Sequence, residues 1–97
     1  MADSPRSYRE FWPHYVRAHS RLMTQRAHML ATLAGAACAV SGLVVGEIWL
    51  IPCGALVAYS ISIPSHFLIE GNRPTVVGHP LWSAMADVHM CMLMLAA

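Results

Sequence analysis

Two long apolar runs dominate the pattern of polar and hydrophobic positions along the chain. Residues 29–46 and 48–69 contain no charged side chain, and Glu47 is the only charge between them. At about 1.5 Å per residue, a helix made from either run is long enough to cross a hydrocarbon core of about 30 Å. The short connection requires these two helices to run antiparallel. The pattern therefore predicts a transmembrane helical hairpin with spans over residues 27–46 and 48–69.

Small residues recur every three or four positions along the first predicted span. They are Ala31, Gly35, Ala39, Gly42 and Gly46. Such a stripe allows another helix to approach closely. The second span of the same chain and a second copy of the chain are both candidates for that helix, so the pattern leaves a homo-oligomer open.

The segment before the first span is more polar and follows a helical period. His19 falls on its apolar face and His14 on the opposite, polar face. Ser7 matches a helix-capping pattern, but Pro13 suits the first turn of a helix better than its interior, so the pattern leaves the first residue of this helix open. We predict an amphipathic interfacial helix over residues 7–25, with His19 in apolar surroundings and His14 facing water.

A polar loop and a third apolar helix follow the second span. The loop covers residues 70–79, and Pro80 then occupies a favourable first-turn position for a helix over residues 80–97. Asp87 and His89 interrupt this otherwise apolar helix, which either spans the membrane or lies partly embedded in it. The complete pattern predicts a single-domain, all-α integral membrane protein with an amphipathic N-terminal helix, a transmembrane hairpin and a third embedded C-terminal helix.

Composition and charge support a membrane protein and argue against other classes. Of the 97 residues, 57% are hydrophobic and 11% are charged, whereas soluble domains contain about 25% charged residues. The net charge of +1 argues against a nucleic-acid partner. Five of the six basic residues, all arginines, precede the first span, and a hairpin returns Arg73 to the same side. By the positive-inside rule, we expect an integral membrane protein with the lipid bilayer as its partner and a cytoplasmic N-terminus.

The six histidines form the most informative polar pattern, because the predicted hairpin brings all of them toward one face of the membrane. His28 opens the first span and His66 ends the second, so we expect them at the same depth on adjacent helices. An imidazole at that depth needs a hydrogen-bond partner or a metal ion, and the pattern alone leaves both open. Glu70, one turn after His66, is placed to bind a metal or to orient the imidazole. Imidazole and carboxylate groups suit zinc, iron or nickel better than an iron–sulfur cluster.

The sequence after the second span is specific enough to indicate a family. The segment from His66 to Pro74 reads HFLIEGNRP, and the sequence HPLWS begins at His79 and precedes Asp87. These blocks closely resemble the Mpo-type family of small membrane proteins, which includes iron-dependent 2-hydroxy fatty acid dioxygenases. His19, His28 and the aromatic residues before them resemble the N-terminal pattern of the same family.

The resemblance implies an enzyme that uses Fe(II), molecular oxygen and a 2-hydroxy fatty acid, and that removes one carbon by cleaving the C1–C2 bond. It also implies roles for eight residues: His19, His28, His66 and His79 as metal ligands, Glu70 and Asp87 as catalytic residues that support or replace a ligand, and Asn72 and Arg73 as substrate-binding residues. A guanidinium suits a carboxylate geometrically, and a membrane-interface anchor is the alternative role for Arg73.

Two other functions fit the same pattern. His28 and His66 on facing helices are suited to hold haem through two axial ligands. Alternatively, the histidines are hydrogen-bonded helix-end groups of a non-enzymatic membrane scaffold. The sequence contains no HExxH, CxxC or GxSxG motif, so hydrolases of those classes are disfavoured.

Overall fold

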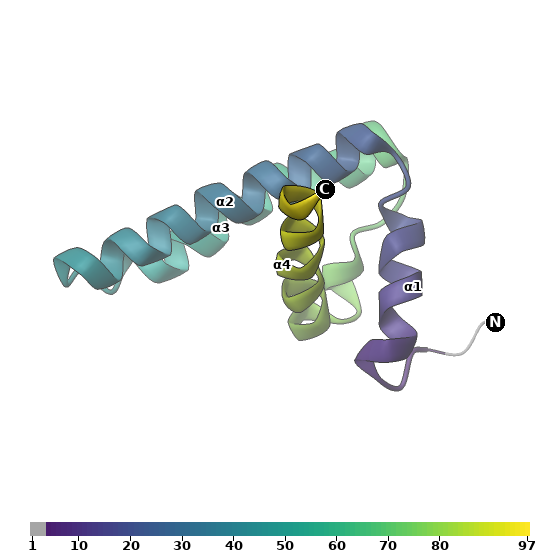
Figure 1. The fold of residues 1–97 in the computed structure, drawn as a ribbon, viewed down its shortest axis with the longest axis horizontal. Helices are drawn as coiled ribbons and strands as arrows, with labels where there is room; N and C mark the ends of the chain where they lie inside the picture. Colours follow the sequence, from purple (N-terminus) through teal and green to yellow (C-terminus); the bar gives the residue numbers. More distant parts are fainter. Residues whose placement is uncertain (1–3) are drawn as a thin grey trace.

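All elements of the fold are helical. The structure, a computed structural model, describes residues 4–97 and has no β-strand in that range. The elements in chain order are α1 (Tyr8–Ala18), α2 (Leu22–Val45), α3 (Leu50–Ser65), the π-helix η1 (His66–Glu70), the 3-10 helix η2 (Thr75–Val77) and α4 (Pro80–Ala96) (Figure 1). The prediction of an all-helical protein is confirmed.

A long antiparallel hairpin of α2 and α3 forms the body of the molecule (Figure 1). α2 and the continuous segment Leu50–Glu70, which joins α3 to η1, are each long and apolar enough to cross a membrane. Gly46 ends α2 in the left-handed conformation, with φ 77°, and so permits the tight reversal toward α3. α4 has 17 residues and is shorter than either candidate span.

The stripe of small residues on α2 serves the contact with α3. A Cβ atom on Gly54 would lie 2.5 Å from the carbonyl oxygen of Gly35, and one on Gly35 would lie 2.8 Å from the carbonyl oxygen of Gly54. At the other end of the stripe, a Cβ on Gly42 would lie 2.7 Å from the carbonyl oxygen of Glu47. These distances are too short for any side chain, so the backbones of the two helices approach directly. Packing within the chain therefore uses the stripe.

The first helix starts before Pro13. Ser7 is its N-cap, and the Ser7 hydroxyl accepts a hydrogen bond of 3.3 Å from the backbone N–H of Glu10. Pro13 then lies inside α1, where its ring nitrogen cannot donate to the carbonyl of Arg9. Because Arg9 is exposed, water can satisfy that carbonyl. The capping pattern was thus the better guide to the helix start than the proline.

A bend at residues 19–21 divides the single helix that the period predicts over residues 7–25. The carboxylate of Glu70 holds this bend, since it accepts hydrogen bonds from the backbone N–H of Arg21 at 2.7 Å and from the hydroxyl of Ser20 at 2.8 Å. The bonded residues are 49 and 50 positions apart in the sequence. Periodicity contains no sign of so distant a contact, which explains why the prediction of one continuous helix was wrong.

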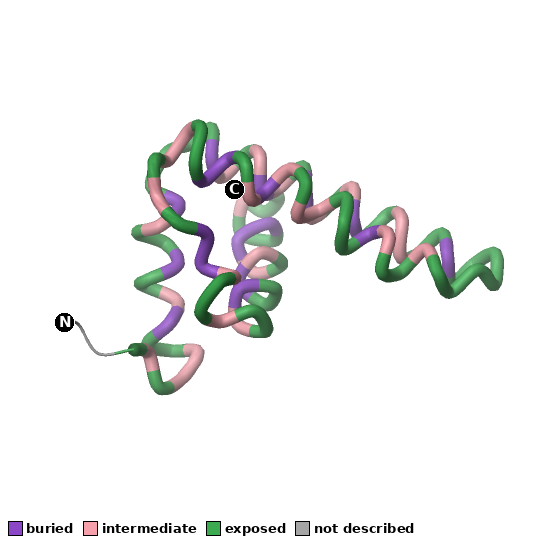
Figure 2. The backbone as a smooth tube through the Cα atoms, turned by 180° about the vertical axis from the view of Figure 1, so that it is seen from behind, coloured by how far each residue is buried: buried purple, intermediate pink, exposed green. Residues whose placement is uncertain are grey.

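α1 and α4 lie across one end of the hairpin (Figure 1), where α4 packs against both α2 and α1. The core between α1 and α4 consists of Phe11, Tyr15, Ala86 and Met90. Buried positions gather at this end and are sparse toward the tip of the hairpin (Figure 2). The buried core therefore lies at the end where the chain enters and leaves the hairpin.

Candidate metal centre

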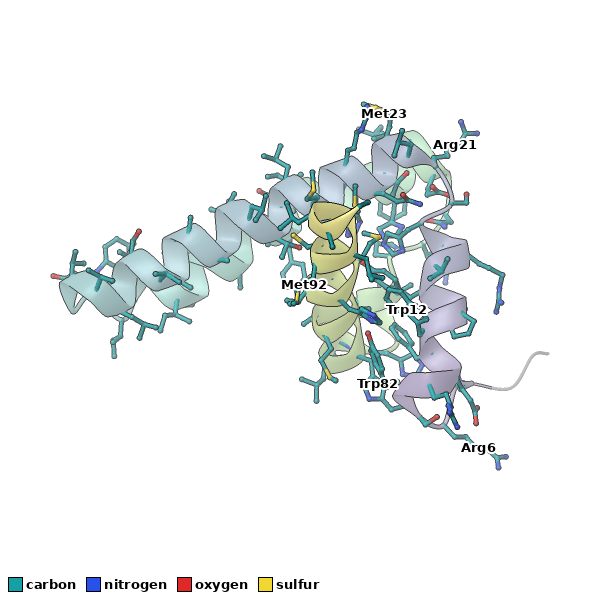
Figure 3. The ribbon with its side chains drawn as sticks, viewed as in Figure 1. Arg6, Trp12, Arg21, Met23, Trp82 and Met92 are labelled. Atoms are coloured by element: carbon teal, nitrogen blue, oxygen red, sulfur yellow. The ribbon has the colours of Figure 1, made fainter. Side chains whose placement is uncertain are left out.

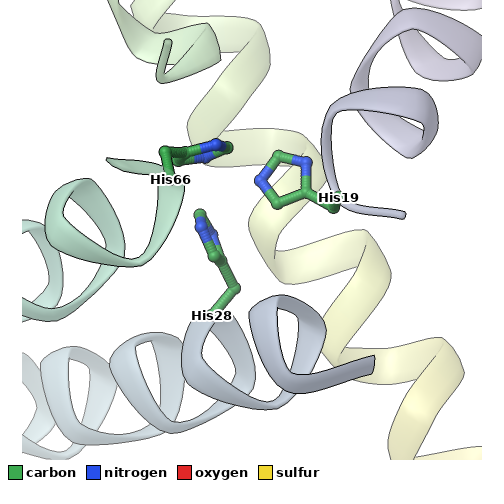
Figure 4. Close-up of side chains that lie close together, drawn as sticks. All are labelled: His19, His28 and His66. Atoms are coloured by element: carbon green, nitrogen blue, oxygen red, sulfur yellow. The ribbon is translucent and has the colours of Figure 1, made fainter. Parts of the chain in front are cut away.

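Three buried histidines from separate elements meet at the covered end of the hairpin (Figure 4). His19 follows α1, His28 lies in the second turn of α2 and His66 is the first residue of η1. The ring centroids are 4.3 Å apart for His19 and His28, 4.5 Å for His19 and His66, and 4.9 Å for His28 and His66. One ring nitrogen of each residue lies within 4.8 Å of those of the other two, and the three residues are at most 4% exposed. This group of side chains, called the histidine cluster below, can hold a metal ion.

One hydrogen bond orients each imidazole and leaves the same nitrogen free in all three. The Nδ1–H groups donate to protein oxygens, namely Tyr15 O at 2.7 Å for His19, Asp87 Oδ1 at 3.1 Å for His28 and Asn72 Oδ1 at 2.7 Å for His66. The three Nε2 atoms are buried and have no hydrogen-bond partner among residues 4–97. A buried polar atom without a partner costs free energy, and three such atoms in one place need an explanation. Metal ligation supplies it, because ligating histidines bind through one nitrogen while the other donates to a protein oxygen.

The protonation state of His19 suits metal binding. Burial lowers the pKa of His19 to about 4, and the neighbouring His28 and His66 act in the same direction. The imidazole of His19 is therefore neutral at neutral pH. Its Nε2 consequently carries a lone pair rather than a proton.

Asp87 joins α4 to the histidine cluster. Its Oδ1 accepts hydrogen bonds from Nδ1 of His28 and from the phenol of Tyr15. Burial and the charge of Asp87 raise the pKa of Tyr15, so the phenol keeps its proton and remains the donor. The ring of Tyr15 also stacks on His19, with centroids 3.9 Å apart. Asp87 and Tyr15 thus fix the orientation of two of the three histidines.

The π-helix brings Asn72 back to His66. The carbonyl of His66 accepts hydrogen bonds from the backbone N–H groups of Gly71 at 2.7 Å and of Asn72 at 2.9 Å. This reversal needs the left-handed conformation of Gly71, whose φ is 76°. The Asn72 side chain then accepts from His66 and donates to the carbonyl of Ala18 at 2.9 Å. The amide therefore orients His66 and connects it to the end of α1, beside His19.

Glu70 and His79 lie outside the histidine cluster. Both carboxylate oxygens of Glu70 are bonded at the bend before α2, so this residue positions the backbone next to His19. His79 stacks on Trp82, with centroids 5.0 Å apart, and its edge meets Phe11 at 5.4 Å. The structure therefore brings together three of the four histidines that the resemblance implies as ligands, and places the fourth in an aromatic contact.

The helical phase of α1 is correct, because His19 is buried and His14 is exposed. Two buried residues, Tyr15 and Thr24, are missing from the site inferred from the sequence. Thr24 is fully buried. Each residue precedes a cluster histidine by four positions, so that it shares a helical face with that histidine. This four-residue spacing is the sequence feature that could have identified both residues.

The fold and the site define a class: an all-helical protein with two helices apolar enough to cross a membrane and a buried cluster of three histidines. The family described as 2-hydroxy-palmitic acid dioxygenase Mpo1-like matches residues 5–97. The chain therefore belongs to this family, and the resemblance in its HFLIEGNRP and HPLWS blocks is confirmed. No curated protein and no solved structure shows a significant match to the chain.

Proposed function

We propose that the protein is an Fe(II)-dependent dioxygenase that shortens 2-hydroxy fatty acids by one carbon. The observation that carries the proposal is the set of three buried Nε2 atoms without partners, in a chain whose family is named for such an enzyme. Three protein ligands leave coordination positions of a first-row metal open, as oxygen-activating non-haem iron sites require. Bound iron would supply the oxygen chemistry, and the protein supplies the ligands and their orientation.

The proposed roles follow from the contacts of each residue. His19, His28 and His66 hold the metal through Nε2. Asp87 keeps the Nδ1–H of His28 engaged and so holds the imidazole in the ligating tautomer. Asn72 does the same for His66.

Arg73 is proposed to bind the substrate carboxylate. It directly follows Asn72, and among residues 4–97 it forms no salt bridge. Arg73 borders a hollow of about 690 Å³ together with Arg17 and His79. A guanidinium binds a carboxylate through two parallel hydrogen bonds, so an arginine that follows the partner of His66 in the chain suits a fatty acid head group.

The hairpin is proposed to cross the membrane with the N-terminus on the cytoplasmic side. All six arginines belong to the segments at the histidine end, and Glu47 lies at the opposite tip. A test replaces the three native cysteines by alanine and introduces Glu47→Cys or Ser4→Cys. A reagent that cannot cross membranes should label position 47 on intact cells and spare position 4, and the reverse pattern would invert the topology.

The haem alternative requires a porphyrin between two histidines. The hollow beside His28 and His66 measures about 10 Å³, which is about the space of one water molecule. His19 also packs against both of these rings edge to face. The geometry therefore favours a single metal ion over haem.

The test is oxygen consumption by detergent-purified protein loaded with Fe(II). Addition of a long-chain 2-hydroxy fatty acid should start oxygen uptake and release a product one carbon shorter. The corresponding acid without the hydroxyl group should react poorly, because it chelates the metal through its carboxylate alone. Iron-loaded protein that consumes no oxygen with the hydroxy acid would refute the proposal.

A further inference from the structure

The proposed reaction places the head of a fatty acid at the histidine cluster, and the acyl chain must extend from there. Three hollows border this region, and they differ in size and polarity. The hollow beside His28, His66 and Asp87 measures about 10 Å³, so it admits a molecule of the size of water or dioxygen but no acyl chain. The hollow of about 690 Å³ has a mixed lining that includes Arg17 and Arg73 as well as the acidic Glu10 and apolar residues such as Val77, and its two arginines suit an acidic head group.

The third hollow, of about 260 Å³, lies between α1, the start of α2 and the C-terminal half of α4. We call it the α1–α4 groove. Its walls are mainly apolar and include Val16, Leu93 and Met94. The polar side chains in its lining are His19 and Gln25, and the amide of Gln25 is already bonded to the carbonyl of His19 at 2.8 Å.

The depth of the groove follows from burial. His19 is 1% exposed, whereas Val16 is 43% and Leu93 is 53% exposed. The groove therefore runs from an open apolar rim to one of the three histidines of the cluster. An apolar wall that leads inward to an imidazole is complementary to a molecule with a long hydrocarbon chain and a polar end.

We infer that the α1–α4 groove holds the acyl chain of the substrate, an inference that rests on the proposed function. The head then lies between the histidine cluster and the arginine-lined hollow, and the chain leaves past His19 on the opposite side of α1. Methionine in the groove wall suits this role, because its flexible thioether adapts to chains of different length. Val16 and Leu93 at the rim determine how much of the chain fits.

Crosslinking locates the acyl chain without relying on turnover. The probe is a 2-hydroxy fatty acid with a photoreactive diazirine in the middle of its chain, bound to iron-loaded protein under nitrogen. Crosslinks should concentrate on Val16, Leu93 and Met94, and an excess of unlabelled 2-hydroxy acid should suppress them. Crosslinks spread over the exposed faces of α2 and α3, and unaffected by the competitor, would overturn the inference.

A matched pair of variants tests the groove by size. Leu93→Trp fills the groove, and Met92→Trp adds the same ring at the preceding residue of α4. Met92 is 64% exposed and lies on the side of α4 turned away from α1, whereas Trp12 lies between the two helices (Figure 3). Leu93→Trp should weaken binding of a sixteen-carbon hydroxy acid by about tenfold and shift the preference to shorter chains. Met92→Trp should stay within about twofold of the unmodified protein.

The outcomes of these experiments distinguish failure of the groove assignment from failure of the proposed reaction. An active enzyme whose chain-length preference is the same in both tryptophan variants would refute the groove and leave the dioxygenase standing. Competitor-sensitive crosslinks in the groove without oxygen uptake would support the groove as a binding site and refute the reaction. Metal content, measured in every variant, should not change, since neither substitution removes a histidine of the cluster or one of its hydrogen-bond partners.

Discussion

The two ends of the hairpin are built on different principles. At the histidine end, three buried imidazoles are each oriented by a hydrogen bond to an oxygen of another residue. At the tip, Gly42 allows the backbone of the turn at Glu47 to lie against α2, while Val44 and Ile48 are 78% and 72% exposed. Directional polar contacts define the first end, and close backbone packing with outward apolar side chains defines the second. Substitutions should therefore change metal binding at one end and only helix packing or stability at the other.

The largest expected effect is loss of metal after removal of a cluster histidine. His19→Ala should weaken metal binding by more than about tenfold, because loss of even a hydrogen-bond partner of a ligand costs about 10–100-fold in affinity. The matched control is His14→Ala, which removes an exposed histidine from the same helical region. Metal analysis of detergent-purified protein measures both. Equal metal loss in the two variants would contradict the assignment of the site.

The next effect concerns the carboxylate that orients His28. Asp87→Asn keeps the shape of the side chain and removes its charge, so metal affinity should fall by about 10–100-fold while the fold persists. Glu10→Gln, the same change at an exposed position of α1, serves as the control and should leave affinity unchanged. Titration with a competing chelator gives both affinities. An Asp87→Asn variant with the affinity of the unmodified protein would show that Asp87 has no role at the metal.

A smaller effect is expected along the hairpin, where backbones touch. Gly54→Ala introduces a Cβ 2.5 Å from the carbonyl of Gly35, and forcing the helices apart should cost about 1–3 kcal/mol of unfolding free energy. Gly78→Ala is the control, because a Cβ there meets no atom within 4 Å. Denaturant unfolding in detergent, followed by far-UV circular dichroism, compares the two. Metal affinity of folded Gly54→Ala should be unchanged, and a large loss of affinity would argue against independent ends.

The smallest effect compares one substitution at both ends. Glu70→Gln replaces one of two bonded carboxylate oxygens by an amide that cannot accept, so the bend before α2 should lose about 1 kcal/mol. Glu47→Gln at the tip affects an exposed carboxylate whose one side-chain partner in the described part of the chain is the indole N–H of Trp49, and should change stability by less than about 0.5 kcal/mol. The same unfolding experiment measures both variants. Equal losses would contradict the proposed difference between the ends.

Local and long-range information contributed differently to these results. The approach of His28 to His66 was predictable, because a hairpin of two runs of similar length places its first and last turns side by side, and their rings lie 4.9 Å apart. For His19, the sequence predicted only that the side chain lies on the apolar face of the first helix. The bend that turns this residue toward the cluster depends on Glu70, which belongs to the far end of the hairpin. Sequence periodicity describes a helix face and carries no information on such a contact.

His79 shows that a specific sequence block does not reveal which side chains meet in the fold. The residue belongs to a specific sequence block, yet its ring packs between Trp82 and Phe11 rather than with the other histidines. Asp87, which stands eight positions later, reaches His28 because α4 crosses α2. Which of several polar residues meet is determined by the angle at which helices cross, and that angle follows from the packing of all their side chains.

The sequence by itself determined the all-helical class, the hairpin, the two candidate spans and the family, because each depends on local composition, spacing or a contiguous block of residues. Tertiary structure alone decided the remaining features of the site: the bend at residues 19–21, the three unpaired Nε2 atoms, and the roles of Asp87 and Asn72 in orienting their partners among residues 4–97. The physical reason is the range of the interactions. Hydrophobic period and helix propensity act over a few residues, whereas a metal site needs side chains from distant segments to meet within a few ångströms.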